Sequence, residues 1–479
     1  MPAVPWRTQL IVPPARPHSY LRGLAVMVRN PARWWSADMY DVGVRRVPLL
    51  GRTFVHVARP ELARTVLLDE NDAFGRSFVT QGILVPAMGE GLLTADGESW
   101  RRQRRLLAPV FRARTLERSI PAMDRHACAC RDALSKLDGR TEAVLPHTSR
   151  AALDIVVETL FGGVDMDHGT ISRDVDDYLR QLGRPDPLVL LGLPDAVPRP
   201  GRRRGLAAVA RLRAQCRRAL ATLRANGAAT EDSLVGRLLA ARDPDTGEGL
   251  DDELIIDNIH TFIAAGHETT AVALAWTLYA LAHQPGLAER LAEESERLLG
   301  AGPATADAVA SLELHRRTVQ ETMRLYPPAA AIVRTVLRPV RVGPFELGAG
   351  DHVTVATLPM QRNPAYWPDP HAFDESRFVA ERVAERDRFA YLPFGDGSRV
   401  CIGAGFALTE AVLVLARLTP ALRFAAADGR PPEPVLSVTL RPSDGMRLRV
   451  RRVTRPERSG SRTRPEGMPS TGATPAGGA

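Results

Sequence analysis

The stretch Phe394-Gly395-Asp396-Gly397-Ser398-Arg399-Val400-Cys401-Ile402-Gly403 places one cysteine in a glycine-rich turn, two residues after an arginine and just before an apolar run. A nearby cation and the N-terminus of a following helix both favour the ionised sulfur. The glycines let the backbone lie flat against a large planar group, and nearby backbone N–H groups tune how strongly the sulfur donates. Cysteine ligation of haem iron fits this combination, and a buried free cysteine is the plainer alternative.

The same stretch resembles the haem-binding signature of the cytochrome P-450 monooxygenases, Phe-x-x-Gly-x-Arg-x-Cys-x-Gly, with every fixed position filled. The resemblance implies a haem b cofactor with Cys401 as the axial iron ligand and metal-binding residue. It further implies that Phe394 packs near the sulfur, that Arg399 pairs with a haem propionate, and that Gly403 lies at the cofactor. The implied fold is mainly α with small β-sheets (α+β), a single large helical domain around a buried haem.

Composition and charge limit the other classes of protein. Four cysteines in 479 residues do not form a disulfide framework, which indicates packing roles for the other three and a reducing cytoplasm. The net charge of +8 suggests an acidic partner. Nucleic acid is not expected, because no nucleic-acid-binding motif or basic stripe with interleaved aromatic residues is present. The resemblance instead implies a ferredoxin or flavodoxin-like electron donor with its reductase. Arg101, Arg102 and Arg105 are candidate contacts for it, and a plain solvated face remains the equal alternative for them.

The chain is expected to form one catalytic domain, residues 31–453, after a Pro-rich lead-in at 1–30 and before a disordered tail at 454–479. No run of about twenty apolar residues and no signal-peptide pattern is found, so we expect a soluble, bacterial-type, monomeric cytoplasmic protein. Residues 1–37 carry five arginines and no acid. A solvated first helix and weak peripheral contact with a membrane both remain open there.

Hydrophobic patterns predict strands within 47–58, 332–358 and 435–453, mainly helical structure from about 100 to 240, and one long helix over 253–283. The long helix contains Ala264-Ala265-Gly266-His267-Glu268-Thr269-Thr270. A carboxylate beside two hydroxyls is costly to bury without partners. Because threonine can bond back to the preceding turn and glycine weakens a helix, the helix could open there and hold water.

This polar segment resembles the family motif Ala/Gly-Gly-x-Glu/Asp-Thr-Thr. The resemblance implies that Thr269 hydrogen-bonds the iron-bound oxygen, that Glu268 supports a water-borne proton relay, and that Ala265 and Gly266 leave room over the haem. His267 begins an incomplete His-Glu-x-x-His pattern, since alanine stands where a zinc protease has its second histidine. A structural or surface histidine is the better interpretation.

Three further sets of residues follow from the same resemblance. Glu321 and Arg324, at i and i+3 before Pro327-Pro328, match the family's Glu-x-x-Arg motif. Arg377 matches the third member of that ion network, although the residues around it depart from the usual pattern. Trp100 and Arg104, about one helical turn apart, and Arg334 match the clamps that hold the haem propionates.

Residues expected over the haem face are mostly small and apolar, which favours an apolar substrate, and the loop 76–93 is expected to add contacts. Fatty acid, terpenoid and steroid all remain open. The residues are Ala329, Ala330, Ile332, Val333, Leu436 and Val438.

The leading hypothesis is a haem-thiolate monooxygenase that uses O₂ and two electrons from a separate redox partner to hydroxylate or epoxidise an apolar organic substrate. A haem-thiolate peroxygenase, isomerase or dehydratase that does not use O₂ is the first alternative. A non-enzymatic haem-binding protein is the second.

Overall fold

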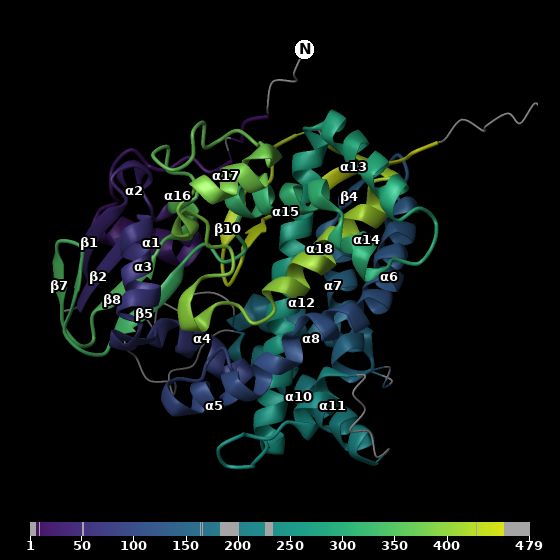
Figure 1. Ribbon diagram of the computed structural model, residues 1–479. Helices are drawn as coiled ribbons and strands as arrows, with labels where there is room; N and C mark the ends of the chain where they lie inside the picture. Colours follow the sequence, from purple (N-terminus) through teal and green to yellow (C-terminus); the bar gives the residue numbers. More distant parts are fainter. Residues whose placement is uncertain are drawn as a thin grey trace, which may run out of the picture.

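The computed structural model describes residues 6–8, 10–49, 52–162, 164, 166–182, 201–225, 233–427 and 429–454. Helices make up most of this part of the chain. The strands β1, β2, β5, β7 and β8 lie on one side of the molecule, and β4 lies on the opposite side (Figure 1). The tail prediction for 454–479 lies outside the described residues except for Thr454. Among the helices within the ranges above, none is both long enough and apolar enough to cross a membrane.

A five-stranded sheet has the order β1-β2-β8-β5-β3, with β2 and β8 parallel and the other neighbours antiparallel. Its inward side chains include Val55 and Val57, both fully buried. The strands of the chain are β1 Val44–Leu49, β2 Arg52–Val57, β3 Phe74–Arg76, β4 Thr141–Ala143, β5 Ile332–Val336, β6 Val340–Val342, β7 Phe345–Leu347, β8 His352–Val355, β9 Leu422–Ala426, β10 Pro434–Leu436, β11 Leu440–Pro442 and β12 Arg447–Arg452.

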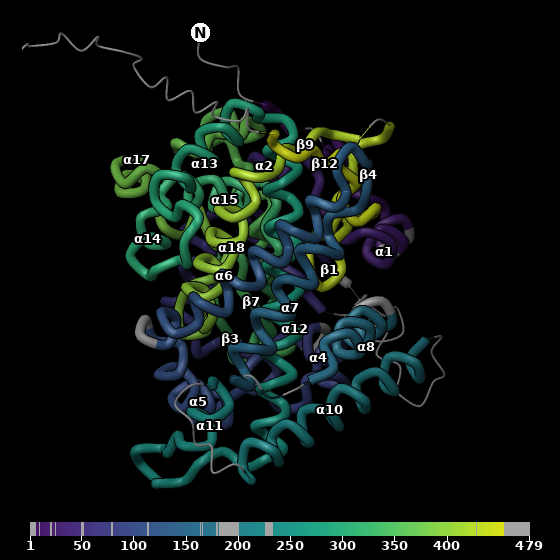
Figure 2. Tube along the Cα trace, turned by 90° about the vertical axis from the view of Figure 1, so that its right-hand side faces the viewer, coloured from purple at the N-terminus to yellow at the C-terminus, as the bar shows by residue number. Residues whose placement is uncertain are grey.

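The helix α12, Asp252–Ala282, runs through the middle of the molecule, and its second half is almost entirely buried (Figure 1). It begins where the Asp251 carboxylate accepts from the Leu254 N–H at 2.8 Å, an N-cap that satisfies one of the free donors of the first turn. α7 and α18 pack against α12, and α6 packs against both of them (Figure 2).

The remaining helices surround this central bundle. They are α1 Tyr20–Arg29, α2 Ala37–Asp41, α3 Pro60–Arg64, α4 Phe78–Met88, α5 Gly97–Leu107, α6 Ala113–Ser135, α7 Leu145–Phe161, α8 His168–Leu182, α10 Arg202–Ala225, α11 Leu234–Ala240, α13 Pro285–Leu298, α14 Ala306–Ala310, α15 Glu313–Leu325, α16 Thr357–Met360, α17 Ala380–Glu385 and α18 Ala404–Leu418.

The predicted positions of the strands and of the long central helix agree with the structure, but the expected loop at 76–93 is wrong. Most of it forms α4. Gly82 and Pro86 weaken the local helix signal, and the segment has no polar face to give a 3.6-residue period. Tertiary packing overrides that local pattern, since Leu84 and Met88 are buried in the apolar cluster beside α12.

A closed ion network joins α15 to the segment before α17. Both nitrogens of one Arg324 edge donate to the Glu321 carboxylate at 2.7 Å, and both side chains are fully buried. The other Arg324 donors reach the carbonyls of Gln361, Pro370 and Ala372. Arg377 lies 3.5 Å from the same carboxylate. The two charges and most of their hydrogen-bonding groups are therefore satisfied inside the protein.

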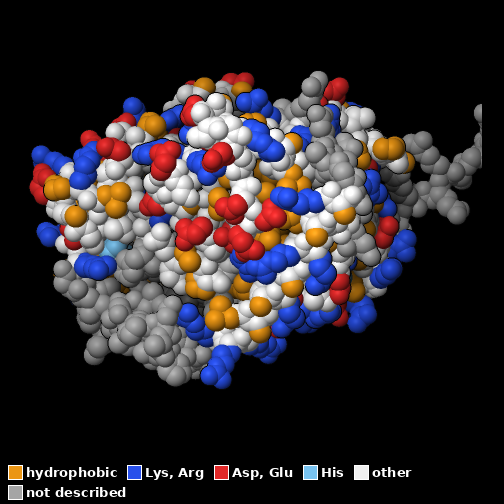
Figure 3. Space-filling view, turned by 90° about the horizontal axis from the view of Figure 1, so that it is seen from below, with side chains coloured by type: hydrophobic (Ala, Val, Ile, Leu, Met, Phe, Trp, Pro, Cys, Tyr) orange, Lys and Arg blue, Asp and Glu red, His pale blue; other side chains and the backbone are white. Residues whose placement is uncertain are grey.

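Three arginines of α5 pair with acids rather than forming a uniformly basic face. Figure 3 shows the underside of the molecule, where Asp and Glu side chains gather near the middle and arginines lie around them. An arginine with an acidic neighbour projects less positive potential, so this face offers alternating charge to a partner. Arg101, Arg102 and Arg105 pair with Glu98, Glu248 and Asp245 respectively.

Candidate haem site

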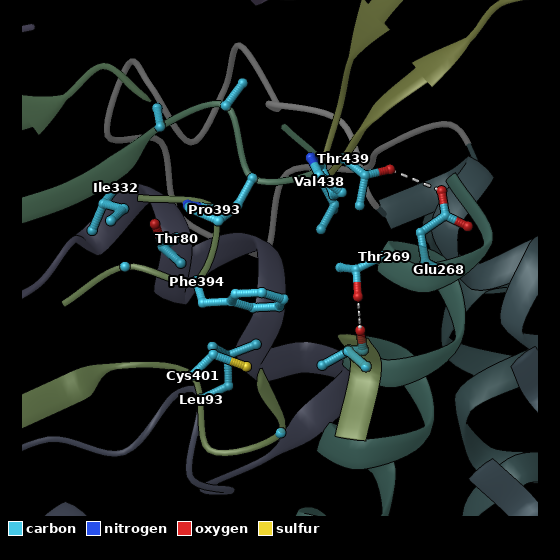
Figure 4. A pocket seen from close by; sticks show the side chains of 18 of the residues that line it. Thr80, Leu93, Glu268, Thr269, Ile332, Pro393, Phe394, Cys401, Val438 and Thr439 are labelled. Carbon is cyan, nitrogen blue, oxygen red and sulfur yellow. Dashed lines mark hydrogen bonds between the residues drawn. The ribbon is translucent and has the colours of Figure 1, made fainter. Parts of the chain in front are cut away.

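A cavity of about 630 Å³ lies between α12 and the glycine-rich loop that carries Cys401. Cys401 has an exposed side chain although it lines this internal space, because its accessible surface opens into the cavity. Figure 4 shows its sulfur on one side, with the Phe394 ring beside it, and Thr269 of α12 on the opposite side. The two sides are separated by room for a large ligand.

The loop around Cys401 is held by backbone contacts. The Cys401 N–H donates to the Phe394 carbonyl at 2.9 Å. Gly397 has a φ of +75°, and a Cβ there would stand 1.9 Å from the Leu67 carbonyl oxygen, so only glycine fits. Burial raises the pKa of the Cys401 thiol, while the Gly403 N–H and the Arg104 charge oppose that effect. A thiolate at this position is thus best stabilised by a bound metal.

Three guanidinium groups line one end of the cavity, and two of them stand directly opposite each other in the sheet. Arg76 of β3 pairs in register with Arg334 of β5. Like charges in that position repel, and Arg399 adds a third charge. Burial and the two neighbouring cations lower the pKa of Arg76 to about 9, and burial lowers that of Arg334 to about 10.

One carboxylate, Asp96, faces these three cations. It pairs with Arg399 and accepts from the backbone N–H of Arg76 at 2.7 Å, and it also caps the start of α5 through the Gly97 N–H. Three positive charges against one negative charge leave an excess of two, and Arg104 of α5 adds a fourth guanidinium to the cavity lining. Haem b carries two propionate carboxylates, so the donor set at this end of the cavity fits that cofactor.

Trp100 and Arg104 of α5 line the cavity from the same side. The Arg399 guanidinium lies 4.2 Å from the centre of the Trp100 ring, a cation–π contact that fixes both side chains. Burial lowers the pKa of Arg104, and the Cys401 sulfur opposes the shift.

The α12 side of the cavity carries the polar segment. The Thr269 hydroxyl donates to the Ala265 carbonyl at 2.7 Å, and both residues line the cavity (Figure 4). This back-bond weakens the helix locally and presents the hydroxyl to the cavity. Gly266 also lines the space, but a Cβ on it would lie 3.0 Å from the Val156 side chain, so its small size serves the contact with α7 as well.

Glu268 points away from Cys401, toward the hairpin of β10 and β11. Its carboxylate accepts from the Thr439 hydroxyl at 2.9 Å and lies 3.5 Å from Arg441 (Figure 4). Glu268 is buried, so these two partners balance its charge. His267, beside it, is buried and has no hydrogen bond to either ring nitrogen within the described part of the chain.

The six residues that the sequence assigned to the substrate face all line this cavity. Apolar side chains from α4, α7, α11 and α12 complete the wall, and Phe111 meets Phe262 edge to face at 5.2 Å. The lining extends outward to Trp34 and His56, where the Trp34 ring N–H donates to His56 Nε2 at 3.3 Å. The predicted residues are Ala329, Ala330, Ile332, Val333, Leu436 and Val438.

Sequence reasoning missed several residues of the site. Arg76 and Asp96 carry no motif, and only the sheet register and the α5 cap bring them to Arg399. Thr439 and Arg441 are separated from Glu268 by about 170 residues, so no local pattern links them.

The chain belongs to the cytochrome P450 family, because the family model "Cytochrome P450" matches residues 39–449. It is thereby an enzyme of the P450 monooxygenase class, with a haem-thiolate cofactor, O₂ and an electron donor.

Several named relatives come from Streptomyces. Cyclooctat-9-en-7-ol 5-monooxygenase of Streptomyces melanosporofaciens is 33% identical over 79% of this chain and 82% of that protein. Cyclooctatin synthase of the same organism is 32% identical over 87% of this chain and 91% of that protein. Pentalenene oxygenase of Streptomyces avermitilis is 31% identical over 88% of this chain and 93% of that protein.

The fold matches solved structures of the same family. The crystal structure of the cytochrome P450DA heme domain superposes with a TM-score of 0.81 at 26% identity, covering 93% of this chain and 99% of that one. The mainly helical fold with small sheets is thus confirmed.

Proposed function

We propose that Cys401 holds haem iron as a thiolate and that the enzyme hydroxylates or epoxidises an apolar, carbocyclic alkene of terpenoid type. Two electrons come from a separate ferredoxin or flavodoxin-like donor with its reductase. The observation that carries the proposal is one cavity with a cysteine on one side, an excess of cations at one end, and a mainly apolar wall elsewhere.

The substrate class rests on the cavity wall and on the relatives. The side chains on the substrate side of the cavity are small and apolar, which suits a compact hydrocarbon rather than a charged ligand. Two relatives are named after carbocyclic alkenes, cyclooctat-9-en-7-ol and pentalenene. These observations favour the terpenoid option over a fatty acid or a steroid.

When bound, haem supplies O₂ binding and O–O cleavage, helped by electron donation from the thiolate. The chain supplies the rest. Arg76, Arg334 and Arg399 would hold the propionates and so fix the orientation of the ring. The Thr269 hydroxyl would donate a hydrogen bond at the distal face, and Glu268 would hold the proton that the relay passes on. The apolar wall excludes bulk water and places the substrate.

The test of the cofactor assignment is the carbon monoxide difference spectrum of the reduced protein, which reports thiolate ligation. Wild type should give the thiolate spectrum, and Cys401→Ser should lose it, whereas Cys216→Ser, at a fully buried cysteine away from the cavity, should keep it. A Cys401→Ser protein that retains the wild-type Soret spectrum would show that another residue binds the iron. Titration with terpenoid, fatty acid and steroid panels, followed by the substrate-induced spectral shift, tests the substrate class.

A further inference from the structure

One side of the cavity is formed by a face of the five-stranded sheet, and we call its lining residues the sheet wall. They share this face because side chains alternate along a strand, whereas residues paired in register on neighbouring strands point to the same side. In the row across the strands, Val333 of β5 pairs with Thr354 of β8, and Thr354 pairs with His56 of β2. The row therefore changes from apolar to polar on the way out from β5. The sheet wall consists of Val47, Phe54, His56, Val333 and Thr354.

The hydrogen bond from Trp34 determines which nitrogen of His56 carries the proton. An indole N–H can only donate, and that of Trp34 reaches His56 Nε2 at 3.3 Å, so Nε2 is the acceptor and the neutral ring carries its proton on Nδ1. Burial lowers the pKa of His56 to about 4, which keeps the ring neutral near pH 7. Nδ1 is buried and has no hydrogen-bond partner among the described residues. His56 is therefore a neutral residue of the sheet wall with one unused N–H group.

Trp35 adds a second unused N–H group to the cavity lining. Its side chain is buried, lines the cavity, and makes no hydrogen bond through the indole nitrogen within the described part of the chain. A ring N–H is fixed in the plane of its ring, so neither Trp35 nor His56 can find another acceptor without moving the whole ring. Buried polar groups in folded proteins nearly always have partners. Two such donors in one cavity lining therefore indicate that a bound molecule supplies an acceptor.

The charge nearest to His56 along the sheet is already balanced. Arg45, opposite His56 on β1, donates to the Ser36 hydroxyl at 2.8 Å and pairs with Asp38 at 3.2 Å. A carboxylate bound at His56 would be buried beside a neutral ring, which is costly. A hydroxyl or ketone oxygen accepts a hydrogen bond without carrying a charge, so it is the acceptor that the sheet wall fits. The Thr354 hydroxyl can donate to that oxygen or accept from it.

We propose that His56 and Thr354 bind an oxygen atom that the substrate already carries, a hydroxyl or ketone group on the terpenoid skeleton, and that this contact selects the carbon to be oxidised. The inference rests on the proposed function, since it concerns the substrate of the same cavity. Neighbouring strands lie about 4.8 Å apart, so His56 lies about 10 Å along the sheet from Val333. A skeleton held at His56 by its oxygen presents its opposite end beside Val333, and the oxidised carbon is therefore remote from the bound oxygen. A reaction that adds oxygen to the skeleton must precede this one.

The first measurement compares three probes that share one ring skeleton: the hydrocarbon abietadiene, the alcohol abietadienol and the carboxylic acid abietic acid. Their dissociation constants with the holoenzyme come from the substrate-induced spectral shift. Wild type should bind the alcohol about 3–10-fold more tightly than the hydrocarbon, because a hydrogen bond between neutral groups contributes about that much. The acid should bind more weakly than the alcohol. Equal binding of alcohol and hydrocarbon, tightest binding of the acid, or binding of neither alcohol nor hydrocarbon overturns the proposal.

His56→Phe keeps an aromatic ring in the sheet wall and removes the N–H donor. It should bind the hydrocarbon at least as tightly as wild type does and should lose the preference for the alcohol. Phe54→Leu, two residues earlier on the same face, should change both affinities by the same factor. A His56→Phe protein that keeps the preference, or a Phe54→Leu protein that loses it, overturns the assignment of His56.

Thr354→Val keeps the test decisive if His56→Phe does not fold. It removes the hydroxyl beside His56, so it should weaken binding of the alcohol and leave binding of the hydrocarbon unchanged. The matched control is Thr335→Val, at a β5 threonine that lies 3.2 Å from His352 Nδ1 and is not among the cavity-lining residues. Unchanged affinity for the alcohol in Thr354→Val, or an equal loss in Thr335→Val, overturns the assignment of Thr354.

The product distribution separates a positioning role of His56 from a structural one. With abietadienol, wild type should oxidise mainly one carbon, remote from the hydroxyl, and His56→Phe should give several products. An unchanged distribution in His56→Phe overturns the selection of the carbon by this contact. The carbon monoxide spectrum and the terpenoid, fatty acid and steroid titrations test the proposed function without reference to His56. Failure of the preference for the alcohol is therefore distinguishable from failure of the proposed function.

Discussion

Two buried arginine clusters in this protein are built in opposite ways. Around Glu321, Arg324 has a bidentate carboxylate partner and three backbone carbonyls. Around Asp96, three arginines share one carboxylate, and two of them oppose each other across paired strands. The closed cluster is complete in the chain alone, so it supports the fold. The open cluster keeps an excess of positive charge in the chain alone, so we propose that the cofactor carboxylates bind there.

The largest expected effect tests the closed cluster. Glu321→Ala leaves Arg324 charged and buried without its partner, and removing one member of such a pair costs about 3–5 kcal/mol. We expect little folded protein, measured as soluble yield and as the urea midpoint of any product. Arg338→Ala is the matched surface control, since solvent screens exposed pairs such as Arg338 with Asp72 and they contribute little to stability. A Glu321→Ala protein of normal yield and midpoint would contradict the comparison.

The next prediction tests the open cluster around Asp96. Removing one of its arginines should weaken the haem-loaded protein but not the haem-free protein. Arg76→Gln or Arg334→Gln would remove the proposed charged hydrogen bond to a haem propionate. Such a bond contributes about 1.5–3 kcal/mol, so the haem dissociation constant should rise by about 10–100-fold. The haem-free protein should unfold at the same or a higher urea concentration, because the repulsion between β3 and β5 is relieved.

Haem transfer to an acceptor protein and urea unfolding of the apoprotein measure these two quantities. Arg101→Gln, at an exposed residue that pairs with Glu98, should change neither. If Arg76→Gln destabilised the haem-free and haem-loaded forms equally, the open cluster would support the fold, as the closed cluster does, and the prediction would be wrong.

A smaller effect concerns Glu268, whose charge is balanced by only two partners. Thr439→Val keeps the side-chain shape and removes the hydrogen bond at 2.9 Å, while Arg441 remains. A hydrogen bond to a charged group contributes about 1.5–3 kcal/mol, so product formed per electron should fall by about tenfold. Haem content should stay unchanged. An unchanged yield of product per electron would show that the β10–β11 hairpin does not position Glu268.

The smallest effect comes from His56, at the outer end of the cavity. Burial, with a minor effect of Arg45, lowers its pKa to about 4, and the Trp34 ring N–H donates to its Nε2. As pH falls, the unfolded chain protonates His56 before the folded chain does. The contribution of His56 to the free energy of unfolding is therefore complete above about pH 6.5 and is lost as pH falls toward 4. Wild type should lose about 1 kcal/mol of unfolding free energy between about pH 7 and 5.5 from this residue, and His56→Gln should not. Urea midpoints at the two pH values measure it, and an equal loss in both proteins would contradict it.

The sequence predicted what local pattern encodes. The turn at Cys401, the polar break in α12 and the Glu321–Arg324 spacing are short motifs, and the structure places each of them at the cavity or in a buried ion pair. The long apolar helix and the strands were equally local signals. The α4 segment failed because its helix depends on burial against α12 rather than on its own periodicity.

The missed residues depend on register and on contacts between distant segments. Arg76 looks like any surface arginine until β3 pairs with β5. Glu410 falls in the apolar helix α18, and only the folded chain shows that its carboxyl is fully buried at the cavity. Residues that act through partners far away in the chain have no signature in a single sequence.

The Asp96 side chain reaches three separate parts of the chain at once, since it caps α5, holds β3 and pairs with Arg399, two residues before the sulfur. A protein that docks on α5 and tilts this helix would pull on Asp96. That displacement would reach the cysteine loop through one carboxylate, without any movement of the apolar core. Asp96 thus joins the outer helix α5 directly to the loop that carries Cys401.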